Sequence, residues 1–267
     1  MIQGFAITTR GSEKEVNDDK VVLGNLALSS GFVSSRFEEP FIAAVFDGVS
    51  QGGKGSEASN IAASLLLEHL YSTDCEAGMD DIKALLSDIS AALVRFHRSS
   101  GASSRAATTV SGMAVGTGSR IIGFNSGDSR VYRYRSEMLV QMTVDHTVVQ
   151  SLINSGADEF LIDRAETTDA HVITKALGLP SGNQEVADVE EFGDFVEGDI
   201  YLGCTDGLTG FISRDDIKRV LAAGVSLEVA GKTLVSMALH NGSYDNISLF
   251  LLTRNADSNQ DVSSGLI

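Results

Sequence analysis

The sequence predicts an α+β fold: two packed antiparallel sheets with a pair of helices on each outer face, in α-β-β-α layers. Apolar runs of strand-like length dominate the chain. The short segments GTGS, SGDS and RSEM separate four successive runs and are typical of turns between antiparallel strands. Two pairs of helical runs lie apart from these strands, and helices grouped beside antiparallel strands favour a layered body.

The first hundred residues supply three predicted strands and one pair of helices. Residues 2–9 and 19–26 are predicted strands. Residues 41–47 (FIAAVFD) form a third, apolar run that ends at an Asp-Gly pair. Apolar residues at helical spacing predict helices over about 57–71 and 80–98.

The rest of the chain supplies more strands, the second pair of helices and one irregular excursion. The predicted strands are residues 107–115, 120–126, 130–135, 138–142, 185–192, 199–205 and 246–253. Helices are predicted over 213–222 and 226–239. Residues 145–180 are polar and mixed, with one short helix near 147–155, and an excursion of this length is often functional. Residues 255–267 are small and polar and are predicted to be a flexible tail.

Length and composition indicate a single domain over residues 1–254. Hydrophobic residues make up 43% of the 267, which suits a large core, and no repeat or Pro-rich linker divides the chain. Cys75 and Cys204 lie far apart and predict no disulfide framework. The N-terminus lacks a signal-peptide pattern, and no apolar run reaches the ~18 residues that a spanning helix needs. We therefore expect a cytoplasmic protein. We also expect a monomer, because no long amphipathic seam stands out.

The chain is strongly acidic, with a formal net charge of −16. Such a surface repels nucleic acid and anionic lipid, so neither nucleic acid nor a membrane is an expected partner. Excess charge of this kind favours solubility. A compatible interpretation is that several carboxylates gather to bind divalent cations.

Acidic residues stand at the ends of five apolar strands. They are Asp18 and Asp19, Asp47, Asp128, Asp206 and Asp245. Any one of them can be a turn residue, because Asp-Gly is a common hairpin signal. Several at one sheet edge would repel one another unless cations neutralised them. Oxygen ligands without paired His or Cys favour Mg²⁺ or Mn²⁺ over zinc.

Eight short motifs follow one another along the chain. They are KEVNDD (14–19), VFDG (45–48), ATTVSG (107–112), GDSRVYRY (127–134), MTVDHT (142–147), ITKALG (173–178), CTDGLTGFIS (204–213) and DNIS (245–248). In this order and spacing the chain resembles the metal-dependent protein phosphatases, the type 2C serine/threonine phosphatases, in their compact bacterial form. The resemblance extends from about Gly4 to Thr253.

The resemblance implies a β-sandwich flanked by helices, with two Mn²⁺ or Mg²⁺ ions at one end and a third ion possible. Asp47 would bridge the two ions. Asp206 and Asp245 would bind the first ion, and the carbonyl of Gly48 would bind the second. Asp18 would contribute to the second ion.

Three further roles follow from the same resemblance. Asp19 would orient the attacking water, and Asp128 would help Asp206 to hold a third ion. Residues 145–180 would form the flap that borders the substrate groove. The implied reaction is hydrolysis of phosphoserine and phosphothreonine in proteins by a water that the cations activate. The implied partners are phosphorylated proteins and a cognate kinase.

The chain departs from the family pattern at three positions. Lys14 replaces the Arg that usually clamps the substrate phosphate, and Lys supplies charge but no bidentate fork. Val49 replaces a histidine proposed as general acid in eukaryotic members, and Gly210 replaces an Asp that helps the third ion.

Two other functions stay open at the level of sequence. The departures at Lys14 and Gly210 would suit a phosphoprotein-binding regulatory module with little turnover, although the central carboxylates are all present. A metal-dependent hydrolase of small phosphate esters is the second alternative, and a comparison of phosphopeptides with nucleotides and sugar phosphates would separate it from a protein phosphatase.

Overall fold

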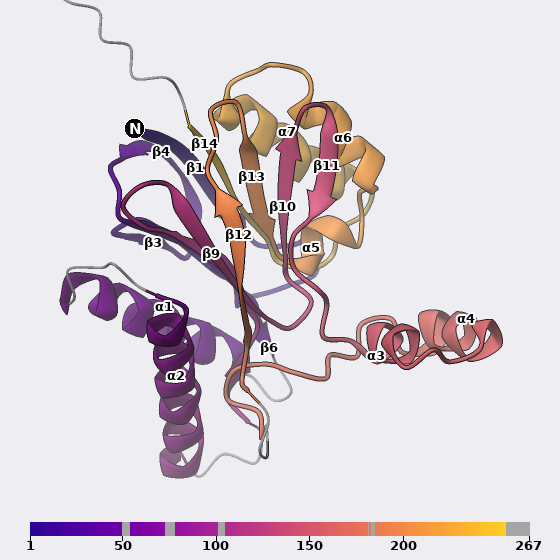
Figure 1. Cartoon of the computed structure of the whole chain (residues 1–267). Helices are drawn as coiled ribbons and strands as arrows, with labels where there is room; N and C mark the ends of the chain where they lie inside the picture. Colours follow the sequence, from indigo (N-terminus) through magenta and orange to yellow (C-terminus); the bar gives the residue numbers. More distant parts are fainter. Residues whose placement is uncertain (50–53, 73–77, 101–104, 181, 183–184, 255–267) are drawn as a thin grey trace, which may run out of the picture.

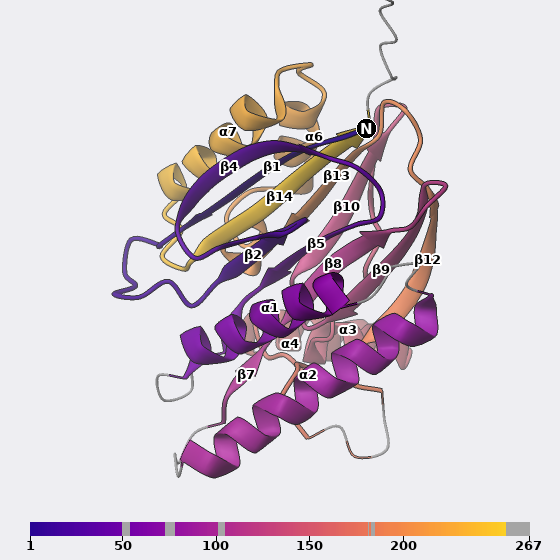
Figure 2. The same ribbon diagram turned by 90° about the vertical axis from the view of Figure 1, so that its left-hand side faces the viewer.

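The computed structural model describes residues 1–49, 54–72, 78–100, 105–180, 182 and 185–254. Cys75 and the tail predicted over 255–267 lie outside these residues. The described residues form two six-stranded antiparallel sheets, which face each other, and a short two-stranded sheet (Figures 1 and 2).

The first large sheet has the strand order β11-β10-β13-β14-β1-β4. Its strands are β1 (Ile2–Thr9), β4 (Gly31–Phe37), β10 (Arg130–Arg135), β11 (Met138–Gln141), β13 (Ile200–Cys204) and β14 (Ile247–Arg254). The second large sheet has the order β12-β9-β8-β5-β2-β3. Its strands are β2 (Lys20–Leu23), β3 (Leu26–Leu28), β5 (Phe41–Phe46), β8 (Val110–Val115), β9 (Arg120–Ser126) and β12 (Asp188–Asp194). The short sheet pairs β6 (Gly48–Val49) with β7 (Ala107–Thr108).

Helices cover the outer face of each large sheet, as Figure 2 shows. The helices on the second sheet are α1 (Gly55–Ser72) and α2 (Met79–Ser100), and those on the first sheet are α5 (Asp206–Thr209), α6 (Arg214–Leu221) and α7 (Leu227–His240). The pairs α1–α2 and α6–α7 are the two predicted helix pairs. The predicted α-β-β-α order is therefore confirmed.

Three apolar clusters lie between the four layers, and β5 contributes to two of them. Successive side chains of a strand point to opposite faces of its sheet. The even-numbered residues of 42–46 join the cluster beneath α1 and α2, and the odd-numbered residues of 41–45 join the cluster between the sheets. All six side chains are buried. Burial on both faces explains why β5 reads as a continuous apolar run.

Several strands differ from the sequence prediction, and the single strand predicted over 107–115 is wrong, because β7 and β8 divide this run between two sheets. The single strand predicted over 19–26 is wrong: Gly24 has a φ of 58°, and the chain turns there between β2 and β3. Glycine adopts this left-handed backbone at no steric cost. The edge strand β4 is not predicted, because its side chains are exposed or half-buried and carry no strong apolar pattern.

Residues 145–180 contain two helices that extend away from the sandwich (Figure 1). They are α3 (Val148–Asn154) and α4 (Glu159–Thr168). The sequence predicts the first helix and misses the second. Ala165 is the one buried residue of α4, and the large apolar residues Phe160, Leu161 and Ile162 are consecutive, so they form no clear stripe at helical spacing.

The two ends of this helical excursion lie side by side at its base. The Val148 N–H donates to the Val172 carbonyl at 3.0 Å. Thr147 and Ile173 form an antiparallel β-bridge. The excursion is therefore a closed hairpin on a narrow stem.

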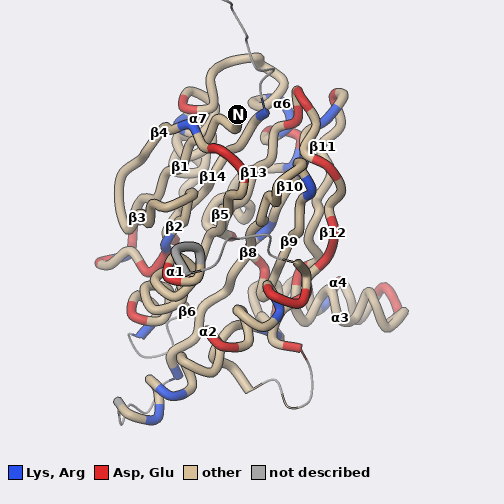
Figure 3. Tube along the Cα trace, turned by 60° about the vertical axis from the view of Figure 1, so that its left-hand side comes forward, with Lys and Arg blue, Asp and Glu red and all other residues tan. Residues whose placement is uncertain are grey.

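Acidic residues are distributed along the chain trace, on both helical layers and along β12, and do not form one block (Figure 3). This distribution agrees with the interpretation of most of the excess charge as solvated surface. None of the helices in the described ranges combines the length and the apolar character that crossing a bilayer requires.

Candidate metal centre

The strand ends that carry the predicted acidic residues meet at one end of the sandwich. In the second sheet, Phe46 at the end of β5 pairs with Lys20 at the start of β2. In the first sheet, Cys204 at the end of β13 pairs with Leu249 near the start of β14. The turn between β9 and β10 crosses from one sheet to the other beside them. This topology gathers the carboxylates of Asp19, Asp47, Asp128, Asp206 and Asp245.

Hydrogen bonds fix the backbone around Asp47. Its N–H donates to Thr109 Oγ1 at 3.1 Å, and its carbonyl accepts from Thr108 Oγ1 at 2.9 Å. Neither bond uses the Asp47 carboxylate. A Cβ at position 48 would lie 2.2 Å from the carbonyl oxygen of Gly55, so the close approach of α1 requires glycine there.

Asp18 and Asp19 join the two sheets. The Asp18 N–H donates to Asn246 Oδ1 at 2.9 Å, and the Asp18 carbonyl accepts from Ser59 Oγ at 2.5 Å. Asp19 is 1% exposed, and its Oδ2 accepts from Thr205 Oγ1 at 2.9 Å. Asp19 directly precedes β2 of the second sheet, and Thr205 directly follows β13 of the first sheet. This bond therefore joins the two sheets.

The Asp206-Gly207 pair is not a hairpin turn. Asp206 begins α5, and a Cβ on Gly207 would lie 1.9 Å from the carbonyl oxygen of Asn246. Glycine is required because α5 approaches the start of β14 so closely. At Asp47-Gly48 the chain passes from β5 into β6. The turn alternative is therefore wrong at both Asp-Gly pairs.

Lys14 lies among these carboxylates. Its Nζ forms an ion pair with Asp245 Oδ1 at 2.6 Å, and it also feels the charges of Asp47 and Asp18. Burial acts against the charge, but the hydrogen bond and attraction to Asp245 outweigh it and raise the pKa of Lys14. The structure thus places the predicted phosphate-binding residue at the predicted metal site.

The buried carboxylates raise one another's pKa values. Burial, and then repulsion from Asp206, raises the pKa of Asp128 to about 7. Burial also raises the pKa of Asp19 to about 7, with repulsion from Asp206 and Asp245 added to it. The pKa of Asp47 is raised well above its usual value by burial and by the same neighbours. Each of these carboxylates is costly to ionise without a neutralising charge.

The chemistry of this donor set fits a hard divalent cation. Within the described ranges, no group of three or more His, Cys, Asp or Glu side chains is arranged so that it could hold a metal ion. The gathered side chains are nevertheless all carboxylates, and their mutual repulsion would be relieved by positive charge. Carboxylate and carbonyl oxygens are the ligands that Mg²⁺ and Mn²⁺ prefer. The ligand roles of the individual residues stay predictions.

An open pocket of about 310 Å³ adjoins the carboxylates. Asp128 and Asp206 line it from the sandwich, and Glu166 and His171 line it from the helical excursion. Gly210, which replaces the family's Asp, lines the same pocket. The excursion therefore borders the candidate metal centre.

Four residues that hold Asp18, Asp19 and Asp47 in place are not among the predicted site residues. Thr205 and Asn246 lie inside the motifs CTDG and DNIS, so motif position could have indicated them. Thr109 lies in ATTVSG and can be found in the same way. Ser59 lies in α1 outside every motif, and no sequence signal marks it. Cys204 is buried and free, as expected of a packing residue.

Comparisons with known proteins agree with this architecture. No protein-family model matches the chain. The serine/threonine phosphatase stp of Listeria innocua is 25% identical over 252 residues, which cover 93% of this chain and 94% of that protein. The crystal structure of serine/threonine phosphatase Stp1 from Staphylococcus aureus superposes with a TM-score of 0.80 at 22% identity and covers 96% of each chain.

The chain is thus similar to serine/threonine phosphatases of type 2C over nearly its whole length. A further structure of this fold, the catalytic domain of the protein phosphatase PstP in complex with two manganese ions, has a TM-score of 0.75 at 23% identity. It covers 95% of this chain and 99% of that chain. The fold of these two structures thus extends over nearly the whole chain.

Proposed function

We propose that the protein hydrolyses phosphoserine and phosphothreonine in proteins, with two divalent cations held at the end of the sandwich. One observation carries this proposal: carboxylates from both sheets, far apart in sequence, gather at one site and raise one another's pKa values. Such a cluster is unfavourable in a folded protein unless bound cations neutralise its charge. Similarity to serine/threonine phosphatases along nearly the whole chain supports the choice of reaction.

Asp47 lies centrally in the cluster and would contact both cations. Asp206 and Asp245 would hold one of them, and Asp18 with the Gly48 carbonyl would hold the other. When bound, the cations supply a water of lowered pKa and neutralise charge on the phosphoryl oxygens.

The remaining residues bind and orient. Asp19, anchored by Thr205, would orient the attacking water. Lys14 would contact a phosphoryl oxygen while it stays paired with Asp245. Asp128 would serve with Asp206 if a third ion binds. No side-chain nucleophile is needed for this reaction.

Hydrolysis of an aryl phosphate, with and without Mn²⁺, tests the proposal. We expect turnover that depends on Mn²⁺ and that falls roughly a hundredfold or more, about 2.7 kcal/mol in the barrier, in Asp206→Asn. The substitution keeps the shape of the side chain and removes its charge. Asp215→Asn, at an exposed position of α6, is the matched control and should leave turnover unchanged.

Two outcomes would contradict the proposal. Phosphopeptide binding without turnover under Mn²⁺ or Mg²⁺ would favour the regulatory module. Preference for nucleotides or sugar phosphates over a phosphopeptide panel would favour a small-ester hydrolase. The proposed partners are phosphorylated proteins and the kinase that modifies them, and we propose that the protein acts on them as a monomer.

A further inference from the structure

His146 occupies the point where three parts of the molecule meet. It follows β11 and directly precedes Thr147, the N-cap residue of α3. Its ring is 12% exposed and lies against the turn between β9 and β10, which carries Asp128. It takes no part in the proposed reaction.

The hydrogen bonds of the ring determine its tautomer. The Gly127 N–H donates to His146 Nδ1 at 3.0 Å, so Nδ1 must be the unprotonated nitrogen. Nε2 therefore carries the proton and donates to Asp188 Oδ2 at 3.0 Å. Lys175 Nζ holds the other oxygen of Asp188 at 2.6 Å. Burial, which lowers the pKa of His146, favours the same neutral form.

The backbone of His146 bonds to the same turn as its ring and also to the far end of the hairpin. Its N–H donates to the Gly127 carbonyl at 2.9 Å, and its carbonyl accepts from the Thr174 N–H at 2.8 Å. Thr174 and Lys175 follow α4, at the base of the excursion. One residue thus ties the turn at Gly127 to both ends of the α3–α4 hairpin and, through Asp188, to β12.

The turn that His146 holds is closely packed and requires glycine. Gly127 has a φ of 117°, and a Cβ there would lie 2.6 Å from Thr109 Cγ2. The next residue is Asp128, whose side chain lines the pocket opposite the excursion. A change in the Gly127 peptide would therefore move the Asp128 carboxylate.

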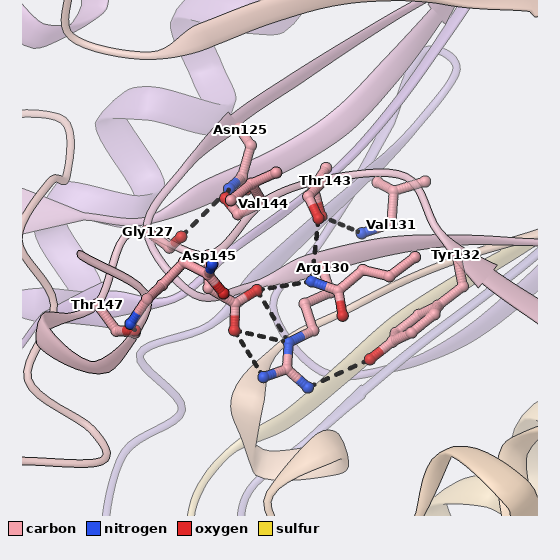
Figure 4. Close-up of polar contacts among 11 residues, drawn as sticks. Asn125, Gly127, Arg130, Val131, Tyr132, Thr143, Val144, Asp145 and Thr147 are labelled. Carbon is pink, nitrogen blue, oxygen red and sulfur yellow. Dashed lines mark hydrogen bonds and ion pairs between the residues drawn. The ribbon is translucent and has the colours of Figure 1, made fainter. Parts of the chain in front are cut away.

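Neighbouring contacts secure the local fold without the His146 ring. Asn125 Nδ2 donates to the carbonyls of Gly127 and Val144 at 3.2 and 2.9 Å. Arg130 makes an ion pair with Asp145, with its Nη2 2.6 Å from Asp145 Oδ2 (Figure 4). Loss of the ring should thus loosen the Gly127 peptide and leave the strands around it in place.

We propose that His146 is a positioning residue, which holds the Asp128 carboxylate and the base of the α3–α4 hairpin in one fixed arrangement at the pocket. The part of this proposal that concerns turnover rests on the proposed phosphatase function. The part that concerns the Gly127–Asp128 turn does not, because it can be measured without substrate.

Three substitutions distinguish the hydrogen bond at Nδ1 of the ring from the hydrogen bond at Nε2. In His146→Asn the amide oxygen can still accept from the Gly127 N–H, but the side chain is too short to reach Asp188. In His146→Gln the amide can reach Asp188 and no acceptor remains at the Nδ1 position. His146→Leu removes both bonds. His240→Asn, at the exposed end of α7, is the matched control.

The first measurement is hydrogen exchange of the Gly127 amide, resolved by NMR. We expect exchange to accelerate roughly tenfold in the Leu and Gln variants, as for loss of one buried hydrogen bond, and to return towards the parent rate in the Asn variant. The second is the Mn²⁺ concentration for half-maximal aryl phosphate hydrolysis, with kcat and KM measured separately. It should rise roughly threefold or more in Leu and Gln, and less in Asn.

Each outcome decides the proposal. Unchanged exchange and Mn²⁺ dependence in His146→Leu would overturn it, as would equal changes in the Asn and Gln variants. If His146→Leu does not fold, the comparison of Asn with Gln gives the same decision. If the parent protein has no turnover, the proposed function fails, and the exchange rates still test the positioning role.

Discussion

Lys14 stands where the family pattern has Arg, and the structure shows which group its side chain contacts. Its ammonium contacts Asp245 at 2.6 Å, inside the carboxylate cluster, and is not free in a loop. A single point charge can attract a phosphoryl group but cannot form the two parallel hydrogen bonds of a guanidinium.

Substitution of Lys14 should change substrate binding. We expect Lys14→Met to raise KM for a phosphopeptide roughly tenfold, about 1.4 kcal/mol, and Lys14→Arg to give a KM at or below that of the parent. Steady-state kinetics at saturating Mn²⁺ would measure both. Lys218→Met, at an exposed position of α6, removes the same charge away from the site. An unchanged KM in Lys14→Met would show that Lys14 does not take part in substrate binding.

At the scale of elements, local sequence rules explain the helices on the sandwich better than the excursion. The helix α6 begins with a capping box, in which Ser213 Oγ accepts from the Asp216 N–H at 3.1 Å and the Asp216 carboxylate accepts from the Ser213 N–H at 3.3 Å. Its residues Ile217 and Leu221 are buried. Cap and apolar spacing agree, so the sequence locates this helix within one residue at each end.

Removal of this cap should destabilise the fold and leave catalysis unchanged. For Ser213→Ala we expect a loss of about 1 kcal/mol in the free energy of unfolding, because the first-turn N–H groups lose their acceptor. Urea denaturation followed by circular dichroism would measure it, with an unchanged kcat under native conditions. A drop in kcat of the folded variant would indicate that α6 also affects the metal centre.

The helix α4 shows why the excursion was harder to predict. It has an N-cap, since Asp158 Oδ1 accepts from the Leu161 N–H at 3.0 Å. It lacks a buried face, and Phe160 is 74% exposed. Periodicity arguments detect the burial of one face, so a helix that projects from the body gives them little signal. Its role as a flap remains a prediction.

At the scale of the whole molecule, the carboxylate cluster ties stability to cations and pH. Asp19 and Asp128 have folded-state pKa values of about 7, above the ~3.9 of an unfolded Asp. The folded chain thus binds more protons than the unfolded chain between these values. The stability that these groups contribute is complete below about pH 4 and is lost as the pH rises through about 7.

This linkage predicts the behaviour of protein from which metal has been removed. In excess chelator, the contribution of each such group should fall by up to about 1.4 kcal/mol per pH unit between pH 5 and pH 7. Urea unfolding across this range would measure it. Asp128→Asn removes one titrating group and should flatten the dependence. Added Mn²⁺ should restore stability at pH 8. Equal pH dependence of parent and Asp128→Asn would contradict the pKa assignment.

The sequence by itself determined which chemistry the chain carries. The order of its motifs indicated the resemblance to the type 2C phosphatases, and the apolar spacing of β5 and the helix pairs predicted the layers. These features are local, so each can be detected within a few neighbouring residues. The expected cytoplasmic location and monomeric state remain predictions from composition.

The tertiary structure decided how that chemistry is arranged. It determined that Asp206-Gly207 opens a helix, that Lys14 pairs with Asp245, and that His146 joins the Asp128 turn to the excursion. Such contacts join residues far apart in the sequence, as between Asp18 and Asn246, 228 positions away. Local propensity carries no information about these pairs, because they form only when antiparallel strands from both sheets end at the same edge.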